Sequence, residues 1–256
     1  MTISIRRAYP VMIFLYLALN LAGCATTTAN LPPEQPAMHS VQEFADDEQI
    51  LVNDPMEGYN RSIYKFNYNF DKYFFLPVVN TYEFILPTFA QTGVSNFFNN
   101  INEFRTLYNS LFQAKGEKAL TTLGRFLTNS TIGIGGLFDP ATSFGMKRQN
   151  EDFGQTLGVW GVDAGPYFVL PLLGPGTVRS AGGFVVDSGI HYAAKSIIDL
   201  PKRIDHGDEV IAGLTVLKAI DNRHQQSFRY HDTGYPFEYE LVQFLFRQSR
   251  ELQVMK

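Results

Sequence analysis

Glycine is concentrated in one part of this chain, and that concentration restricts the fold more than any other feature. Residues 124–183 hold 13 of the 21 glycines, together with Pro140, Pro166, Pro171 and Pro175. Long helices rarely persist through such a composition, because glycine adds backbone freedom and proline removes a hydrogen-bond donor. We therefore expect helices on both sides of this region, and tight hairpins or loops within it.

Two segments of the glycine-rich region are apolar and almost uncharged. They are TIGIGGLFDPA at 131–141 and GPYFVLPLLGPGTV at 165–178. Connecting segments normally run over the surface of a protein and are polar. Segments this apolar must instead be buried in protein or face an apolar environment.

Apolar residues recur at helical spacing outside this region. The first helix is predicted to begin at the Asn-Asp-Pro signal of residues 53–55 and to end at Pro77. Further helices are predicted after Pro87, after Gly116, and over the ranges 184–198, 208–224 and 237–252. The fold class predicted from this pattern is mainly α, with one domain over residues 51–256.

The first predicted helix has two different faces. One face is aromatic and the other is rich in asparagine, which is an amphipathic pattern. The aromatic face consists of Tyr59, Ile63, Phe66, Phe70 and Tyr73, and the polar positions are Asn60, Arg61, Lys65, Asn67 and Asn69.

Aromatic residues are abundant in the whole chain. The sequence contains 22 Phe, 13 Tyr and 1 Trp, which together make up 14% of its residues. Such residues can form a large core, or they can place amphipathic rings at a membrane interface. Composition alone favours the core.

The only cysteine, Cys24, follows a segment that has the layout of a secretory signal. Arg6 and Arg7 supply a positive start, and residues 11–21 form an apolar run too short to span a bilayer comfortably. Residues 21–24, LAGC, resemble the lipobox of bacterial lipoproteins, in which the cysteine is acylated and becomes the first mature residue. The alternative is a plain cleaved signal. We predict a lipoprotein signal peptide at 1–23 and a flexible, Pro-rich tether at 24–50.

Charge and motifs argue against several classes of function. Removal of residues 1–23 leaves 19 basic residues against 25 acidic ones, a formal charge of −6, which does not favour nucleic-acid binding. The histidines form no zinc-binding pattern, and neither Ser143 nor Ser188 lies in a nucleophile elbow. We predict no catalytic residues, no metal and no cofactor.

Four stretches together resemble the MlaA family, also called VacJ. They are NDPMEGYNRSIYKFNYNFD (53–71), GVSNFFNNI (93–101), RFLTNSTIGIGGLFDPA (125–141) and FGQTLGVWGVDAGPYFVLPLLGPGTVR (153–179). The last stretch is the most specific, because it is long and unusual in composition. Two positions depart from the family pattern: Ser180 and Tyr235 stand where acidic residues are usual.

The resemblance implies a fold and a function. Members of the family form a single-domain ring of amphipathic helices in the periplasmic leaflet of the outer membrane, with a central amphipathic channel. They remove mislocalised phospholipids from the outer leaflet and pass them to a periplasmic carrier, MlaC, with trimeric porins as outer-membrane partners. For this chain, the resemblance therefore implies retrograde phospholipid transport by a lipid-anchored protein of a Gram-negative outer membrane, acylated at Cys24.

Within this framework we predict two groups of site residues. An apolar hairpin is predicted to gate the channel, with glycines providing backbone freedom; a buried structural turn is the alternative. Its residues are Thr131, Ile132, Gly133, Ile134, Gly135, Gly136, Leu137 and Phe138. Possible headgroup contacts are Asn60, Arg61, Asn67 and Arg179, although an arginine also serves as a structural clamp to carbonyls or carboxylates.

Two further functions remain open at this point. One is a non-transporting envelope scaffold that associates with porins. The other is a lipid hydrolase, for which the sequence offers no recognisable catalytic motif.

Overall fold

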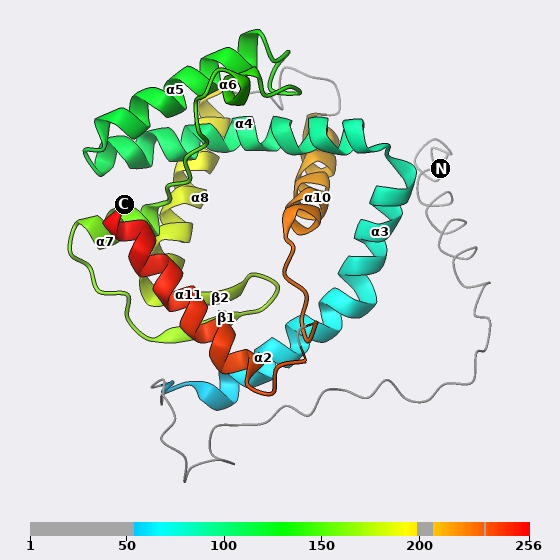
Figure 1. Cartoon of the computed structure of the whole chain (residues 1–256), viewed down its shortest axis with the longest axis vertical. Coiled ribbons are helices and arrows are strands. Elements are labelled where there is room, and N and C mark those ends of the chain that lie inside the picture. Colours follow the sequence, from blue (N-terminus) through cyan, green and yellow to red (C-terminus); the bar gives the residue numbers. More distant parts are fainter. Residues whose placement is uncertain (1–53, 199–206, 233) are drawn as a thin grey trace, which may run out of the picture. The chain divides into compact units, whose positions relative to one another are not determined.

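The computed structural model describes residues 54–198, 207–232 and 234–256, all of which belong to one compact unit. The described part of the chain is mainly helical and has one two-stranded sheet, as the sequence predicted (Figure 1). The predicted signal peptide, Cys24 and the tether lie outside the described residues.

The first helical segment runs further than predicted. It consists of α2 (Glu57–Phe70), a π-helical turn η3 (Asp71–Phe75) and α3 (Leu76–Ile85). The predicted end at Pro77 is therefore wrong. Proline is tolerated in the first turn of a helix, where the missing N–H would have no intrahelical partner. The change from π-helix to α-helix at residue 76 places Pro77 in that position.

The next two helices begin where the sequence predicted. Helix α4 (Thr88–Phe112) starts directly after Pro87, and α5 (Gly116–Thr131) starts at Gly116. The two helices pack against each other along their length (Figure 1).

The glycine-rich region forms short elements, as predicted. These are α6 (Pro140–Ser143), α7 (Phe153–Val159), β1 (Tyr167–Leu170) and β2 (Gly174–Thr177). The strands pair as an antiparallel hairpin in which Tyr167 faces Thr177 and Leu170 faces Gly174. The segment 165–178 therefore contains the expected hairpin, whereas 131–138 forms consecutive turns instead.

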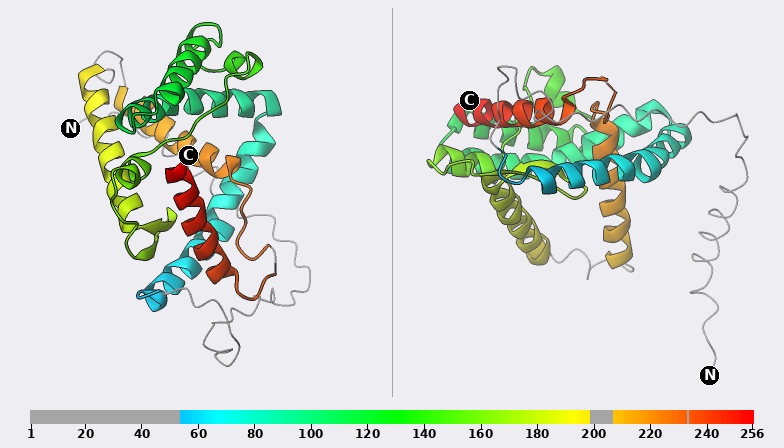
Figure 2. Two further views of the ribbon diagram at one scale, coloured as in Figure 1. Left: turned by 60° about the vertical axis from the view of Figure 1, so that its left-hand side comes forward. Right: turned by 90° about the horizontal axis from the view of Figure 1, so that it is seen from below.

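Three longer helices follow: α8 (Val178–Ile198), α10 (Gly207–Gln225) and α11 (Glu238–Met255). They agree with the predicted periodic runs, except that α8 starts earlier. Helix α8 packs on α7 at two glycines, since a Cβ on Gly183 would lie 2.1 Å from the Gly154 nitrogen. Helix α10 contacts α3 and α4, and α8 and α10 extend on the same side of those two helices (Figure 2). None of the helices in the described part is long and apolar enough to cross a bilayer.

The aromatic core that composition favoured accounts for only part of the aromatic residues. One hydrophobic cluster joins α2, the hairpin and α11 through Tyr64, Tyr167, Val169 and Tyr239. Of the 20 phenylalanines in the described part of the chain, 11 are exposed instead. Those with more than a third of their surface exposed are Phe66, Phe74, Phe84, Phe89, Phe104, Phe112, Phe138, Phe144, Phe184, Phe228 and Phe244.

Candidate functional site

The polarity of helix α5 is inverted relative to a helix of a water-soluble protein, because its buried face is mostly polar and its exposed face is apolar. Its buried positions are Ala119, Thr122, Arg125 and Asn129, so three of the four are polar or charged. Its exposed positions include three leucines, Leu120, Leu123 and Leu127. Water-soluble proteins seldom bury a mostly polar helix face while exposing several leucines on the opposite face.

The neighbouring helices show the same inversion. Helix α4 exposes aromatic and aliphatic side chains at Phe89, Phe104, Leu111 and Phe112. It buries mostly polar ones, at Gln91, Asn100, Glu103, Thr106, Asn109 and Ser110. On α2, Tyr59 and Phe66 of the predicted aromatic face are exposed, and Asn60 and Asn67 of the predicted polar face are buried.

Arg125 holds the polar interior between α4, α5 and α6 together. Its guanidinium donates to Glu103 Oε1 at 2.8 Å, to Asp139 Oδ2 at 2.9 Å and to the Met146 carbonyl at 2.6 Å. Burial alone raises the pKa of Asp139, but hydrogen bonds from Thr142, Arg125 and Asn129 outweigh it and lower that pKa to about 2. Burial also raises the pKa of Glu103, and there the opposing effect of Arg125 is the smaller one. The network thus keeps a charged arginine inside the protein.

The predicted gating residues form a turn that continues from the end of α5. The Gly136 amide donates to the Asn129 carbonyl at 2.8 Å, and the Phe138 amide donates to the Gly133 carbonyl at 2.9 Å. Asparagines of α4 hold the same turn from the side, since Asn96 donates to the Leu137 carbonyl at 3.2 Å.

The side chains of this turn point outward although its backbone is fixed. Ile132, Ile134, Leu137 and Phe138 are all exposed, and only Gly133 and Gly136 are buried. The turn is therefore structural in its backbone, as one sequence interpretation held, but its apolar side chains are not in the core. Whether it gates a channel stays a prediction.

Asn60 and Asn67 bind the β-hairpin in this structure. The Val169 amide donates to Asn60 Oδ1 at 2.8 Å, and the Leu172 amide donates to Asn67 Oδ1 at 2.7 Å. The Nδ2 groups of the two asparagines donate to the carbonyls of Tyr167 and Leu170. Contact of either amide with a lipid headgroup would have to replace these hydrogen bonds.

The two predicted arginines also bind protein groups. Arg61 donates to Glu57 at 2.7 Å, forms an ion pair with Glu240 and lies 4.5 Å from the centre of the Tyr239 ring. Arg179 donates to the Val162 carbonyl at 2.9 Å. Both geometries are those of the structural clamp that the sequence left as an alternative.

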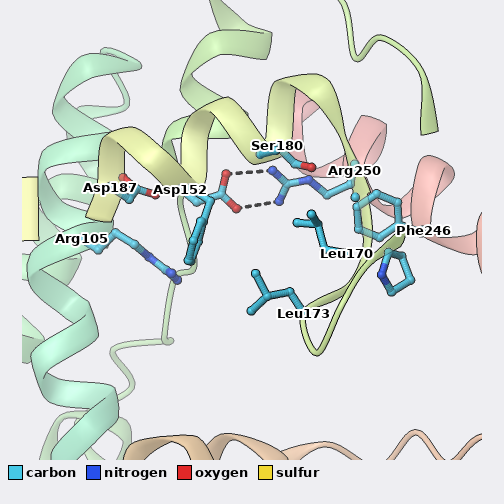
Figure 3. A pocket seen from close by; sticks show the side chains of 12 residues that line it. Arg105, Asp152, Leu170, Leu173, Ser180, Asp187, Phe246 and Arg250 are labelled. Atoms are coloured by element: carbon cyan, nitrogen blue, oxygen red, sulfur yellow. Dashed lines mark hydrogen bonds and ion pairs between the residues drawn. The ribbon is translucent and has the colours of Figure 1, made fainter. Parts of the chain in front are cut away.

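A cavity of about 240 Å³ lies between α4, α7, the β-hairpin, α8 and α11 (Figure 3). Part of its wall is apolar, formed by Leu170, Leu173, Phe184 and Phe246, and part is charged. The charged residues that line it are Arg105, Asp152, Asp187 and Arg250. A cavity with both kinds of wall suits a ligand that is itself amphipathic.

Two of these charges form a pair across the cavity. Both Nη groups of Arg250 donate to the Asp152 carboxylate, at 2.6 and 2.8 Å (Figure 3). Burial alone raises the pKa of Asp152, but the hydrogen bonds and charge of Arg250 outweigh it and lower that pKa. Asp152 also caps α7 by accepting from the Gln155 amide at 2.9 Å.

No sequence pattern predicted this cavity. Asp152 immediately precedes the most specific stretch at 153–179 and has the position of a helix cap, which is the one signal available. Its partner Arg250 is 98 residues away, and no spacing rule connects the two. Among the described residues, no group of three histidine, cysteine or acidic side chains could hold a metal ion.

Comparison with known proteins places the chain among bacterial lipoproteins. It is 37% identical over 140 residues to the intermembrane phospholipid transport system lipoprotein MlaA of Shigella flexneri, a match that covers 53% of this chain and 56% of that protein. Its match to the Haemophilus influenzae protein of the same name is 36% identical and covers 55% and 57% of the two chains. The chain thus matches little more than half the length of these curated relatives.

A solved structure and a family model extend the match. The structure, described as the structural basis for maintenance of bacterial outer membrane lipid asymmetry, aligns with a TM-score of 0.63 and 29% identity. The alignment covers 79% of this chain and all of that chain. The family model for the MlaA lipoprotein matches residues 52–253. On this match, which spans nearly all of the described part, the chain belongs to the MlaA lipoprotein family.

Proposed function

We propose that this chain is an outer-membrane lipoprotein that withdraws mislocalised phospholipids from the outer leaflet. The lipids pass through an amphipathic channel and are handed to a periplasmic carrier of the MlaC type. Acylation at Cys24 anchors the protein in the periplasmic leaflet, and a trimeric porin is its membrane partner.

The inversion of the helices is the observation that carries this proposal. A helix with leucines outside and Thr122, Arg125 and Asn129 inside gains little from the hydrophobic effect in water. In the apolar part of a leaflet, the exposed leucine and phenylalanine side chains are solvated by acyl chains, while Arg125 and Asn129 find hydrogen-bond partners inside the protein. Such a body can offer a polar route to a headgroup while its outer surface stays in lipid.

The names of the relatives support phospholipid as the transported substrate. The proteins of Shigella flexneri and Haemophilus influenzae are named as lipoproteins of an intermembrane phospholipid transport system. The solved structure concerns maintenance of lipid asymmetry in the outer membrane. We therefore take phospholipid as the cargo. Retrieval from the outer leaflet is the direction that we propose, and these names do not specify it.

A deletion strain tests the proposal. We expect phospholipid to accumulate in the outer leaflet when the gene is deleted, and expression of the wild-type chain to restore asymmetry. A Cys24→Ala chain should not restore it, because the acyl anchor is lost. Intact asymmetry in the deletion strain, with only porin association lost, would instead establish the scaffold function.

A second arm tests the gate and the enzyme alternative. Gly135→Pro should disrupt the turn at 131–138, since proline fixes φ near −65° whereas Gly135 has φ +69°, and proline also removes the amide that donates to the Ser130 carbonyl at 3.0 Å. Failure of this variant to restore asymmetry is expected if transport needs the turn, and normal restoration would contradict the gate. Release of lysophospholipid by the purified wild-type chain would favour a hydrolase over a transporter.

A further inference from the structure

We propose that Arg105 is the phosphate-binding residue of a phospholipid subsite in the cavity between α4, the β-hairpin, α8 and α11. The inference rests on the proposed function, since that function supplies phospholipid as the ligand. It adds the residue and the cavity that hold the headgroup.

The other charged groups that line the cavity already have close hydrogen-bond partners in the protein. Asp152 and Arg250 neutralise each other through two hydrogen bonds. The Asp187 carboxylate accepts from the Tyr108 hydroxyl at 2.6 Å, the Asn109 amide at 3.1 Å and the Phe153 backbone at 3.0 Å. The oxygens of both carboxylates are therefore occupied by protein donors other than Arg105.

Arg105 differs from these residues. Its Nη2 donates to the neutral Asn150 Oδ1 at 2.9 Å. Its Nε is shielded from solvent and has no hydrogen-bond partner within the described part of the chain, and no carboxylate there lies within ion-pair distance of its guanidinium. Figure 3 shows the side chain reaching from α4 toward the space beside Asp152. The charge of Arg105 contributes to the lowered pKa of Asp152, but Arg250 holds that carboxylate, so the half-buried guanidinium has no anion in contact and can accept one from a ligand.

The chemistry of the cavity identifies the anion. A guanidinium binds phosphate oxygens through parallel N–H donors. The apolar wall of Leu170, Leu173, Phe184 and Phe246 offers nothing to a free phosphate ion, but it matches the glycerol and the first acyl carbons of a lipid. A phosphodiester with apolar arms uses both walls, and so the cavity fits a glycerophospholipid.

Binding to the purified full chain in nonionic detergent tests this subsite. The probes are phosphatidylglycerol and diacylglycerol, which differ in the phosphate-bearing headgroup. We expect wild type to bind phosphatidylglycerol about tenfold more tightly, the effect of one charge-assisted hydrogen-bonded contact. Arg105→Gln should remove that preference, and Arg105→Lys should retain part of it.

Two controls separate the headgroup contact from general effects. Lys147→Gln removes one positive charge from an exposed position outside the cavity lining and should leave the preference unchanged. Phe184→Ala should weaken binding of both lipids equally, because it removes only apolar wall. Thermal unfolding of each variant in detergent reports whether its fold is intact, and Arg105→Lys keeps the test valid if Arg105→Gln unfolds.

Three outcomes would overturn the subsite. First, Arg105→Gln could keep the wild-type preference for phosphatidylglycerol. That result would exclude Arg105 as the phosphate-binding residue but would leave the proposed function unaffected, because the deletion strain tests that function separately. Inorganic phosphate and glycerol 3-phosphate could bind wild type as tightly as phosphatidylglycerol and lose affinity in Arg105→Gln, which makes free phosphate the ligand. Wild type could bind neither lipid, and then the proposed function fails together with the subsite.

Discussion

The described part of this protein contains two interiors built by opposite means. Where α2 meets the hairpin and α11, four large apolar or aromatic side chains pack together as in a water-soluble domain. Where α4 meets α5 and α6, the interior is a network of amides and charges around Arg125. Both regions expose phenylalanine or leucine outside.

The difference indicates what holds each region together. Removal of apolar area from water stabilises the aromatic interior, and this contribution requires no membrane. The polar interior gains little from that effect, and its stability depends on the hydrogen bonds and ion pairs that its buried groups form. The two regions should therefore respond differently to the loss of a charge, to an added methyl group, to acid and to a change of surface.

The largest effect is expected on removal of the buried guanidinium. Arg125→Met leaves Glu103 and Asp139 without their cation, which should lower the free energy of unfolding by about 3–5 kcal/mol. Denaturant unfolding in detergent measures it. The matched variant beside the aromatic interior is Arg61→Met, which likewise leaves two carboxylate partners, Glu57 and Glu240, without their cation. Because those partners are partly exposed, it should cost about 1 kcal/mol. Equal losses in the two variants would contradict the comparison.

A smaller effect is expected from a methyl group added to the turn after α5. Gly136 has φ +95°, and a Cβ there would lie 2.6 Å from the Asn100 Cβ. Gly136→Ala should therefore cost about 3 kcal/mol from backbone strain and overpacking. Gly135 has φ +69° with no atom within 4 Å of the added Cβ, so Gly135→Ala should cost only about 1 kcal/mol. Thermal unfolding of both variants gives the difference, and similar values would show that Asn100 does not restrict the turn.

Acid should weaken the polar interior specifically. The pKa of Asp139 is lowered to about 2 in the folded protein, against about 4 when unfolded. Its contribution is therefore complete above pH 4 and is lost as the pH falls from 4 to 2, with a total of about 2 kcal/mol. The measurement is unfolding free energy against pH for wild type and Asp139→Asn. The difference between the two should shrink over that window, and a constant difference would contradict the assignment.

The sequence predicted the fold well where local signals decide it. Pro87 and Gly116 predicted the starts of α4 and α5. The helical spacing of aromatic and polar residues predicted which side of α2 is aromatic and which is polar. The prediction failed at Pro77, because a π-helical turn placed the proline in the first turn of α3. A local rule cannot detect that rearrangement, since it depends on the hydrogen bonds of the preceding turn.

The candidate site was less predictable because its contacts are long-range. Asn60 and Asn67 were correctly placed on the polar face, but that face meets the backbone of the hairpin more than 100 residues later. The Asp152–Arg250 pair has the same character. Composition favoured the core over a membrane interface for the aromatic residues, because burial statistics come from proteins in water. Three tyrosines do pack in the hydrophobic cluster, but many phenylalanines are exposed.

The smallest effect on stability is expected on the exposed leucine face of α5. Leu120 is 72% exposed, so Leu120→Gln should change the free energy of unfolding in detergent by less than about 0.5 kcal/mol. The same substitution removes an apolar side chain from the surface proposed to face lipid. In a Cys24→Ser background, which removes the predicted acylation site, binding to neutral phospholipid vesicles should fall about tenfold. Lys147→Gln is the exposed polar control and should bind as the Cys24→Ser parent does. If Leu120→Gln bound vesicles as well as its parent, the leucine face of α5 would not lie in the bilayer, and the inversion of this helix would need another cause.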